Sequence, residues 1–365
     1  MLLRPAGGKA ESSERTEIIM KKERLFYLDF VRAIAAISII LTHFNAKYLY
    51  LNPPAPEKAV ITTRISNLYI GDWGVSLFFI ISGAALMYVY ADRCELKSFY
   101  KKRFLSIYPM FWMAYIGAFC FMFYVNRSVI RSGIPKWRML FSVLGLDGLL
   151  LSNGVETYYI LGEWFLGVIV MLYILFPLIR KLLNEKPELL LVLTVLLYAG
   201  GIALCEIVPY PIAASTLIFV RLPEVVFGMI FVKYGWKVNW KAAVGALAVL
   251  VLNGMIKPTI SSSIQTTYVG IASFLVLVFM SYYLNCGIIK YICGLLSKYS
   301  YAIFLVHHII ITKMTERFDL TQISKLHSHL LFSTICPVIA FFAWALYHVH
   351  SKIMSELKKI DRVKC

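Results

Sequence analysis

The sequence predicts an all-α, polytopic integral membrane protein with about ten transmembrane helices and both termini in the cytoplasm. The first observation behind this is composition. Of the 365 residues, 59% are hydrophobic and only 16% are charged, and the mean hydropathy is +0.72. Soluble domains are usually near half apolar and a quarter charged. The other two observations are the length of the apolar runs and the clustering of lysine and arginine between them.

The apolar runs define the predicted helices, because roughly twenty apolar residues span a bilayer as a helix. Two of the ten runs, 242–256 and 299–313, are short for a full crossing. A weaker apolar stretch at 139–151 contains Gly145 and Asp147, and it is expected to form an interfacial or re-entrant helix. The predicted spans are 28–51, 68–90, 104–125, 158–179, 188–208, 212–232, 242–256, 265–285, 299–313 and 329–349.

The positions of the basic residues predict the orientation. With the N-terminus inside, 24 of the 37 lysines and arginines fall in predicted inner segments and 11 in outer segments, while Arg32 and Arg221 lie within spans. This excess on one side is what the positive-inside rule expects. The net charge of +17 could suggest nucleic acid as a partner, but the basic residues flank apolar runs. The expected surroundings are therefore a lipid bilayer, without nucleic acid.

The chain divides into one transmembrane domain, 25–350, between two polar ends. Residues 1–24 lack the apolar core of a signal peptide, and we expect a disordered cytoplasmic segment in which Met20 is an alternative start. Residues 351–365 are expected to form a basic cytoplasmic tail. No internal repeat divides the apolar region further.

The first span contains the strongest candidate for a functional site. Charged groups at bilayer depth are costly and usually mark function. Arg32 and His43 are eleven residues apart, which places them within roughly 20° of one helix face and about 16 Å apart along the axis. We take them as the candidate catalytic pair. The alternative is that Arg32 extends to the inner interface and His43 lies at the outer one.

Two further spans contain ionisable residues. Arg221 and Glu224 are three residues apart around Pro223, so they can pair on one helix face. They form either a structural ion pair or part of a polar cavity lining. His307 is followed directly by His308, and two adjacent histidines cannot share a helix face. One of them can face a cavity while the other meets lipid headgroups, and a packed hydrogen-bond donor is the alternative for His307.

Ser82, Lys102 and Arg103 complete the candidates. No nucleophile elbow surrounds Ser82, so tight helix packing is the simpler interpretation of its Gly-rich segment. Lys102 and Arg103 stand at the inner mouth of the third span. Such a pair either anchors the topology or binds the phosphates of an anionic cytoplasmic cosubstrate.

Six motifs occur in order along residues 24–350. They are Arg32 with His43 after ten intervening residues, Gly74 to Gly83 (GVSLFFIISG), Phe99 to Pro109 (FYKKRFLSIYP), Trp164-Phe-Leu with Tyr173 and Pro177, Arg221-x-Pro-Glu224-x-x-x-Gly228, and Ser300-x-x-Ile-Phe-Leu-x-His307. Each is weak alone, but together they resemble the acyltransferase 3 family of integral membrane acyltransferases.

Three positions depart from that family's pattern. Ser106 stands where many members have a second arginine, Val168 to Val170 are apolar where many have a glutamate, and Ser76 replaces the usual acidic residue. These differences make the members that act on bacterial O-antigens a poorer match. They favour members that resemble modifiers of exopolysaccharides or surface glycans.

The resemblance implies a multi-pass enzyme of the bacterial cytoplasmic membrane that moves an acyl group, typically acetyl, from cytoplasmic acyl-CoA to a hydroxyl. The implied acceptor is a cell-envelope or secreted glycan, or a lipid-linked saccharide. His43 would act as a base or as a covalent acyl carrier, and the sequence leaves both open. Arg32 would be the second catalytic residue, and Lys102 and Arg103 would bind acyl-CoA. The cavity or supporting residues would be Arg221, Glu224, His307 and Ser82.

A transporter that exports or flips a polysaccharide is the alternative function, since ten helices with buried charges suit that class too. Transporters often show paired repeats, and none is found here. Acyl-CoA is expected as a substrate, with no bound cofactor. No metal site is expected, because the pairs His307/His308 and His327/His329 lack acidic or cysteine partners at ligand spacing. The acceptor sugar, the acyl chain and the oligomeric state are left open.

Overall fold

The computed structural model describes residues 23–127, 133–208 and 212–363, and the regular secondary-structure elements within them are helices, apart from one two-stranded hairpin. The hairpin pairs β1 (Arg64–Ile65) with β2 (Leu68–Tyr69). The predicted all-α class is confirmed. The α-helices are α1 (Phe26–Leu49), α2 (Ile70–Tyr90), α3 (Leu96–Asn126), α4 (Met139–Leu144), α5 (Asp147–Leu151), α6 (Trp164–Glu185), α7 (Pro187–Ile207), α8 (Ile218–Lys233), α9 (Trp240–Ile256), α10 (Ser262–Tyr283), α11 (Gly287–Thr315) and α12 (Lys325–Val363).

Every predicted span overlaps a helix, and eight helices in the described residues are long and apolar enough to cross a membrane. The two that fall short are α8, with 16 residues, and α9, with 17. The apolar stretch 139–151 forms the short helices α4 and α5 instead of a span. The protein is therefore a multi-pass membrane protein.

Several predicted boundaries were wrong, and two of them show why. The span at 299–313 is part of a 29-residue helix, α11, because the polar residues that interrupt its apolar run are compatible with a helix. The span at 158–179 begins as a helix only at Trp164, since residues 158–163 are extended. Helix α12 continues through 351–363, most of the predicted basic tail. Of the predicted disordered segment 1–24, only Glu23 and Arg24 lie among the described residues.

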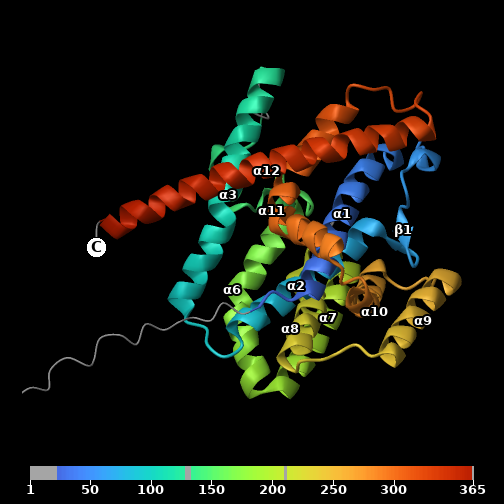
Figure 1. Ribbon diagram of the computed structural model, residues 1–365. Helices are drawn as coiled ribbons and strands as arrows, with labels where there is room; N and C mark the ends of the chain where they lie inside the picture. The colour runs from blue at the N-terminus through green and yellow to red at the C-terminus, as the bar shows by residue number, and fades with distance from the viewer. Residues whose placement is uncertain (1–22, 128–132, 209–211, 364–365) are drawn as a thin grey trace, which may run out of the picture.

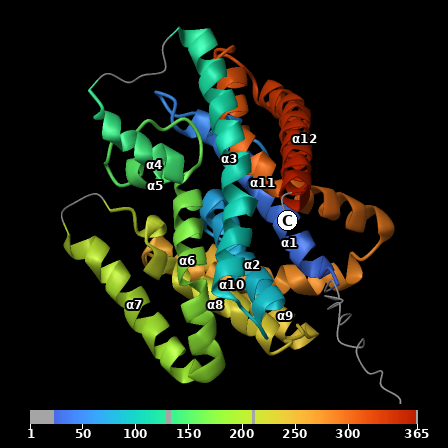
Figure 2. The ribbon, with the colours of Figure 1, turned by 90° about the vertical axis from the view of Figure 1, so that its left-hand side faces the viewer.

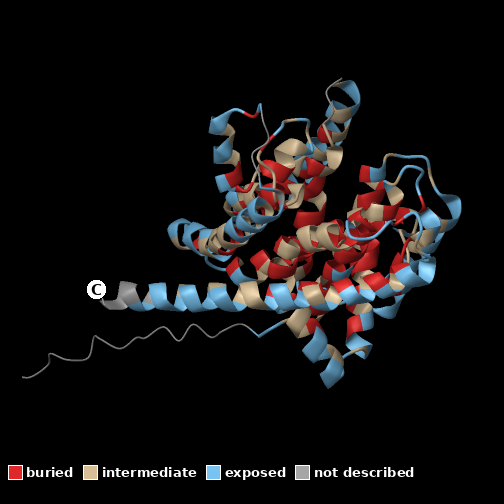
Figure 3. Ribbon diagram, turned by 90° about the horizontal axis from the view of Figure 1, so that it is seen from above, coloured by how far each residue is buried: buried red, intermediate tan, exposed pale blue. Residues whose placement is uncertain are grey.

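Helices α1 and α2 form the centre of the bundle (Figures 1 and 2). Helix α1 packs against α2 and α11, and α2 packs against α8 and α10. The buried residues are concentrated in this central part, while α12 extends away from it and is largely exposed (Figure 3). The outer faces of α3, α7 and α9 expose many large apolar side chains. In a multi-pass protein such faces meet lipid, so the central helices are the ones that can enclose a site.

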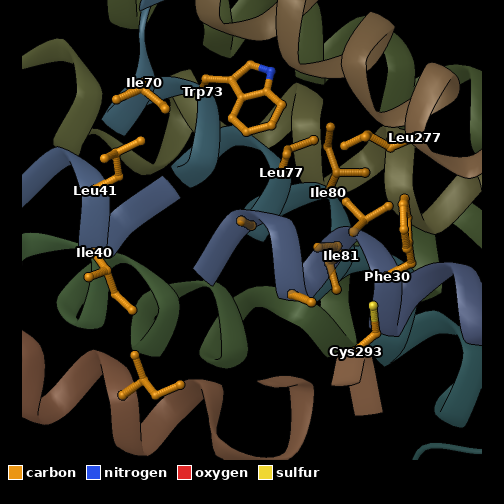
Figure 4. Packing of buried hydrophobic residues seen from close by; sticks show 14 of the residues in the cluster. Phe30, Ile40, Leu41, Ile70, Trp73, Leu77, Ile80, Ile81, Leu277 and Cys293 are labelled. Atoms are coloured by element: carbon orange, nitrogen blue, oxygen red, sulfur yellow. The ribbon is translucent and has the colours of Figure 1, made fainter. Parts of the chain in front are cut away.

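A continuous apolar cluster in the core joins α1, α2, α10 and α11 with several other helices. Figure 4 shows Phe30 of α1, Leu77 of α2, Leu277 of α10 and Cys293 of α11 in this cluster. All four are buried. Because protein interiors are close-packed, this cluster holds α1 at a defined height and rotation relative to α11. That relation places the polar side chains of the two helices against each other.

Helices α2 and α8 approach closely because a glycine of each helix meets the backbone of the other, within one turn along the contact. A β-carbon on Gly83 would lie 2.1 Å from the carbonyl oxygen of Val225, and one on Gly228 would lie 2.0 Å from that of Ile80. Small residues allow such backbone contact between membrane helices. The glycines in the two predicted motifs therefore have a packing role.

Candidate active site

A cavity of about 290 Å³ opens between the central helices. Helices α1, α2, α3, α6 and α11 all contribute to its wall. One part of the wall is polar and another is made of aromatic and branched aliphatic side chains. The lining residues are Arg32, Ala36, Ile39, His43, Val75, Phe78, Ser82, Ser106, Ile107, Glu163, Trp164, Phe165, Leu166, Ile169, Tyr173, Ser300, Tyr301, Ile303 and Phe304.

Arg32 and His43 both line this cavity, three turns apart on α1. Arg32 donates a hydrogen bond of 3.0 Å from its Nη1 atom to Ser297 Oγ on α11, and Ser297 Oγ in turn donates to Asp29 Oδ1 at 2.6 Å. The Asp29 carboxylate is also 3.9 Å from Arg32 Nη1 and forms an ion pair with Arg24. The guanidinium group is thus held at the contact between α1 and α11.

His43 lies among other imidazoles. Its ring centroid is 4.8 Å from that of His307 and 5.2 Å from that of His308, with edge-on geometry in both cases. The adjacent histidines both reach His43, which corrects the prediction that one of them meets lipid headgroups. Successive residues on a helix are about 100° apart, so a ring placed between those two directions contacts both.

His307 supports the cavity from behind, since it is fully buried and outside the lining. Its Nδ1 lies 2.9 Å from the carbonyl oxygen of Phe304 and 3.1 Å from that of Ile303. A ring nitrogen can only donate to a carbonyl, so the proton is on Nδ1. Nε2 is then an unprotonated acceptor, and it is buried without a hydrogen-bond partner among the described residues.

Sequence reasoning missed Glu163, which lines the cavity at the start of α6. Its Oε1 atom lies 3.8 Å from Nδ1 of His308 and accepts a 2.7 Å hydrogen bond from the hydroxyl of Tyr159. Burial, together with the negative charge of the neighbouring Glu163, raises the pKa of the Tyr159 phenol well above its usual range. The phenol therefore stays protonated and donates. Glu163 lies within the predicted span 158–179, so the rule applied to charged residues at bilayer depth could have found it.

The contact between His308 and Glu163 contradicts the reason for which the sequence predicts no metal site. His308 lacks an acidic partner at ligand spacing in the sequence, but the fold brings Glu163 to it from 145 positions away. One ligand atom from each of His43, Glu163 and His308 lies within 4.8 Å of the others.

Arg221 and Glu224 are outside the cavity lining, so of the two alternatives for this pair the geometry fits the structural ion pair. The pair is buried, with 3.3 Å between Arg221 Nη1 and Glu224 Oε1. Arg221 also donates from Nε to the carbonyl of Ser215 at 2.9 Å, and its guanidinium carbon is 5.7 Å from the ring centre of Trp164. Since Trp164 lines the cavity, the ion pair supports the wall through that ring. The guanidinium carbon of Arg221 also lies 5.6 Å from the ring centre of Phe79, so the pair packs against α2.

Ser82 lines the cavity, but its hydroxyl donates a 2.7 Å hydrogen bond to the carbonyl of Phe78 one turn earlier. The two basic candidates on α3 differ from each other. Arg103 is half-buried, and its guanidinium carbon lies 5.7 Å from the ring centre of Tyr173, a lining residue. Lys102 is exposed and does not line the cavity. Adjacent helix positions point about 100° apart, so only Arg103 reaches the cavity edge.

Comparison with known proteins shows the family of the chain. The family described as the acyltransferase domain, Acyl_transf_3, matches residues 25–348. The chain belongs to the acyltransferase 3 family. A curated relative in that class of activity is "Acyltransferase MdmB" of Streptomyces mycarofaciens, which is 23% identical over 164 residues. The match covers 45% of this chain and 41% of that relative. No solved structure matches the chain. Family and relative together support an acyl-transferring membrane enzyme.

Proposed function

We propose that the protein is a membrane O-acyltransferase that moves an acyl group, acetyl in the first instance, from cytoplasmic acyl-CoA to a hydroxyl of a cell-envelope or secreted glycan. The observation that supports this most directly is the cavity that brings His43 and Arg32 of α1 together within the bundle. The family match supports acyl transfer as the reaction class. The donor and the acceptor are inferred from the chemistry of the site and the family resemblance.

His43 is the group best placed to activate the acceptor. A sugar hydroxyl is a weak nucleophile until a base removes its proton, and an imidazole is suited to that role near neutral pH. In the direct route, His43 takes the hydroxyl proton, the oxygen forms the ester C–O bond, and the C–S bond of the thioester breaks. The departing thiolate then accepts the proton from His43. In the covalent route, a ring nitrogen of His43 forms the acyl C–N bond as the C–S bond breaks, and the departing thiolate takes the proton that the ring releases. The acceptor oxygen then forms the ester C–O bond as the acyl C–N bond breaks, and the freed imidazole takes the hydroxyl proton.

The basic residues on the inner side fit the donor. Coenzyme A carries phosphates, which arginine recognises through several N–H donors. In our proposal Arg32 lies deep in the cavity, Arg103 at its edge beside Tyr173, and exposed Lys102 outside it. The thioester then extends toward His43. The acceptor, a glycan or a lipid-linked saccharide, reaches the other end of the cavity in the bacterial cytoplasmic membrane.

The test is acyl transfer in membrane vesicles from labelled acetyl-CoA to the glycan fraction. We expect His43→Ala to lower the rate by about 10²- to 10⁴-fold, the contribution typical of a positioned general base. His327→Ala, which removes an exposed imidazole at the start of α12, is the matched control and should retain full activity. Unchanged transfer in His43→Ala would exclude this histidine as base or carrier.

A further inference from the structure

Beside the cavity lies a polar cluster of three residues, of which only His43 has a role in the proposed reaction. His43 of α1, His308 of α11 and Glu163 at the start of α6 come from three separate parts of the chain. Their ligand-type atoms lie within 4.8 Å of one another, and Tyr159 donates a hydrogen bond to Glu163 at 2.7 Å. A carboxylate exposed to an apolar cavity is costly unless it is paired. Its presence beside two imidazoles therefore calls for a function.

We propose that Glu163 is a positioning residue that stabilises the protonated form of His43 through His308, with Tyr159 holding the carboxylate in place. This inference rests on the proposed function of His43. When His43 takes the proton of the acceptor hydroxyl, the new positive charge lies next to the His308 ring, and His308 Nδ1 faces Glu163 at 3.8 Å. The proton returns to the thiolate leaving group, so the cluster ends the cycle unchanged.

The geometry favours this role over a metal site. Ligands on zinc lie about 2.0–2.2 Å from the ion, so neighbouring ligand atoms in a tetrahedral site are about 3.3 Å apart. The cluster spans up to 4.8 Å, and Oε1 of Glu163 already accepts the Tyr159 hydroxyl. A separation of 3.8 Å between Glu163 and His308 shortens to a hydrogen bond with a small side-chain rotation. Catalytic hydrogen bonds are often long before substrate binds.

The charged and titratable groups around His43 come from three elements. Lys47 lies one turn further along α1, and its Nζ donates to Thr312 of α11 at 2.9 Å. Helix α11 contributes His307 and His308, and the segment before α6 contributes Glu163 with Tyr159. Helix α2 contributes Phe78 and Ser82 to the same cavity, and neither titrates. Among these groups only Glu163 is an acid, so its carboxylate is the counter-charge for an imidazolium at His43.

The experiment compares Glu163→Gln with Glu156→Gln, an exposed acid in the same loop, in vesicles supplied with labelled acetyl-CoA. We expect Glu163→Gln to lower kcat by about 100-fold, the low end of the contribution of a positioned proton-transfer group. The KM for acetyl-CoA should change by less than about twofold, because ground-state binding of the donor is not altered. Glu156→Gln should behave as the unmodified protein.

The pH profile separates an electrostatic role from a merely structural one. Removing an anion disfavours the imidazolium form of a nearby histidine, so the acidic limb of kcat against pH should move to lower pH in Glu163→Gln. A variant that only distorts the cavity lowers kcat equally at every pH. If Glu163→Gln does not accumulate in membranes, His308→Asn should show the same displacement of the acidic limb.

Three outcomes overturn the proposal. Full activity of Glu163→Gln beside an inactive His43→Ala would overturn it while leaving the proposed function intact. Full activity of both variants would instead remove the proposed base. If a chelator abolishes the activity of the unmodified protein and Zn²⁺ restores it, the cluster is a metal site. That result also overturns the proposed role of Glu163.

Discussion

At the scale of single residues, the Arg221–Glu224 pair shows how a charged motif can support a site without lining it. The two groups are buried against each other at 3.3 Å, and Arg221 also contacts Trp164 of the cavity wall. Burying a single unpaired charge is far more costly than burying a matched pair. Breaking this pair should therefore lower the stability of the cavity wall.

We predict that Arg221→Leu lowers stability by about 3–5 kcal/mol, because it leaves Glu224 as an unpaired buried charge. The double variant Arg221→Leu with Glu224→Leu should recover most of that loss. Thermal unfolding of purified protein in detergent measures both. Lys359→Leu is the control, since its pair with Glu356 is largely solvent-exposed and should contribute about 0–1 kcal/mol. A double variant as unstable as the single one would show that the charges themselves are required.

At the residue scale, the sequence predicted which residues share a face of one helix, but it did not predict contacts between residues on different helices. The eleven-residue spacing of Arg32 and His43 predicts a shared helix face, and both residues line the cavity. The proximity of Glu163 to His308 depends on how α6 and α11 pack, and no periodicity within either helix contains that information. The burial of Arg221 behind Trp164 depends on the same kind of long-range packing.

At the scale of helices, the contact between α2 and α8 determines the shape of the cavity wall. Gly83 and Gly228 let the two backbones touch, and α2 contributes Val75, Phe78 and Ser82 to the lining. Any side chain at either glycine must push the helices apart. The cavity would then lose its closed wall on the side of α2.

We predict that Gly228→Ala strongly lowers both thermal stability and activity, since its β-carbon would lie 2.0 Å from the carbonyl oxygen of Ile80. Overpacking a closely packed contact typically costs about 1–3 kcal/mol. Gly245→Ala in α9 is the matched control, because a β-carbon there would meet no other described part of the chain within 4 Å. That control should be neutral or slightly stabilising, because alanine favours a helix interior more than glycine. Equal unfolding temperatures for the two variants would contradict the packing role.

Helix positions were largely predictable from apolar runs, and helix ends were not. The runs located all ten long elements, because a bilayer requires a minimum apolar length. They missed the first three turns of α11, where Lys290 and Lys298 interrupt the apolar pattern without interrupting the helix. They also extended the fourth span into 158–163, where apolar tyrosines and an isoleucine belong to an extended segment that carries Glu163 to the cavity.

At the scale of the whole molecule, the number of crossings determines on which side each loop lies. Eight helices of the described chain meet the length needed to span, while α8 and α9 are shorter. If both short helices cross, the total is ten. If neither crosses, the total is eight. Both totals are even, so both place the two termini on the same side and leave the start of α10 outside. If only one of α8 and α9 crosses, the two termini lie on opposite sides of the membrane.

We predict that the termini are cytoplasmic and that α10 runs from outside to inside. Ser262 begins α10 and Cys286 follows its end, both with exposed side chains, and a helix of 22 residues spans about 33 Å. The measurement uses two single-cysteine variants, one with Ser262→Cys and one with only Cys286. A membrane-impermeant maleimide should label the first in intact cells and the second only after permeabilisation. The reverse pattern would invert the orientation and move Lys102 and Arg103 away from cytoplasmic acyl-CoA. Labelling of both positions in intact cells would show that α10 does not cross, and the path from donor to His43 would then need a different entrance.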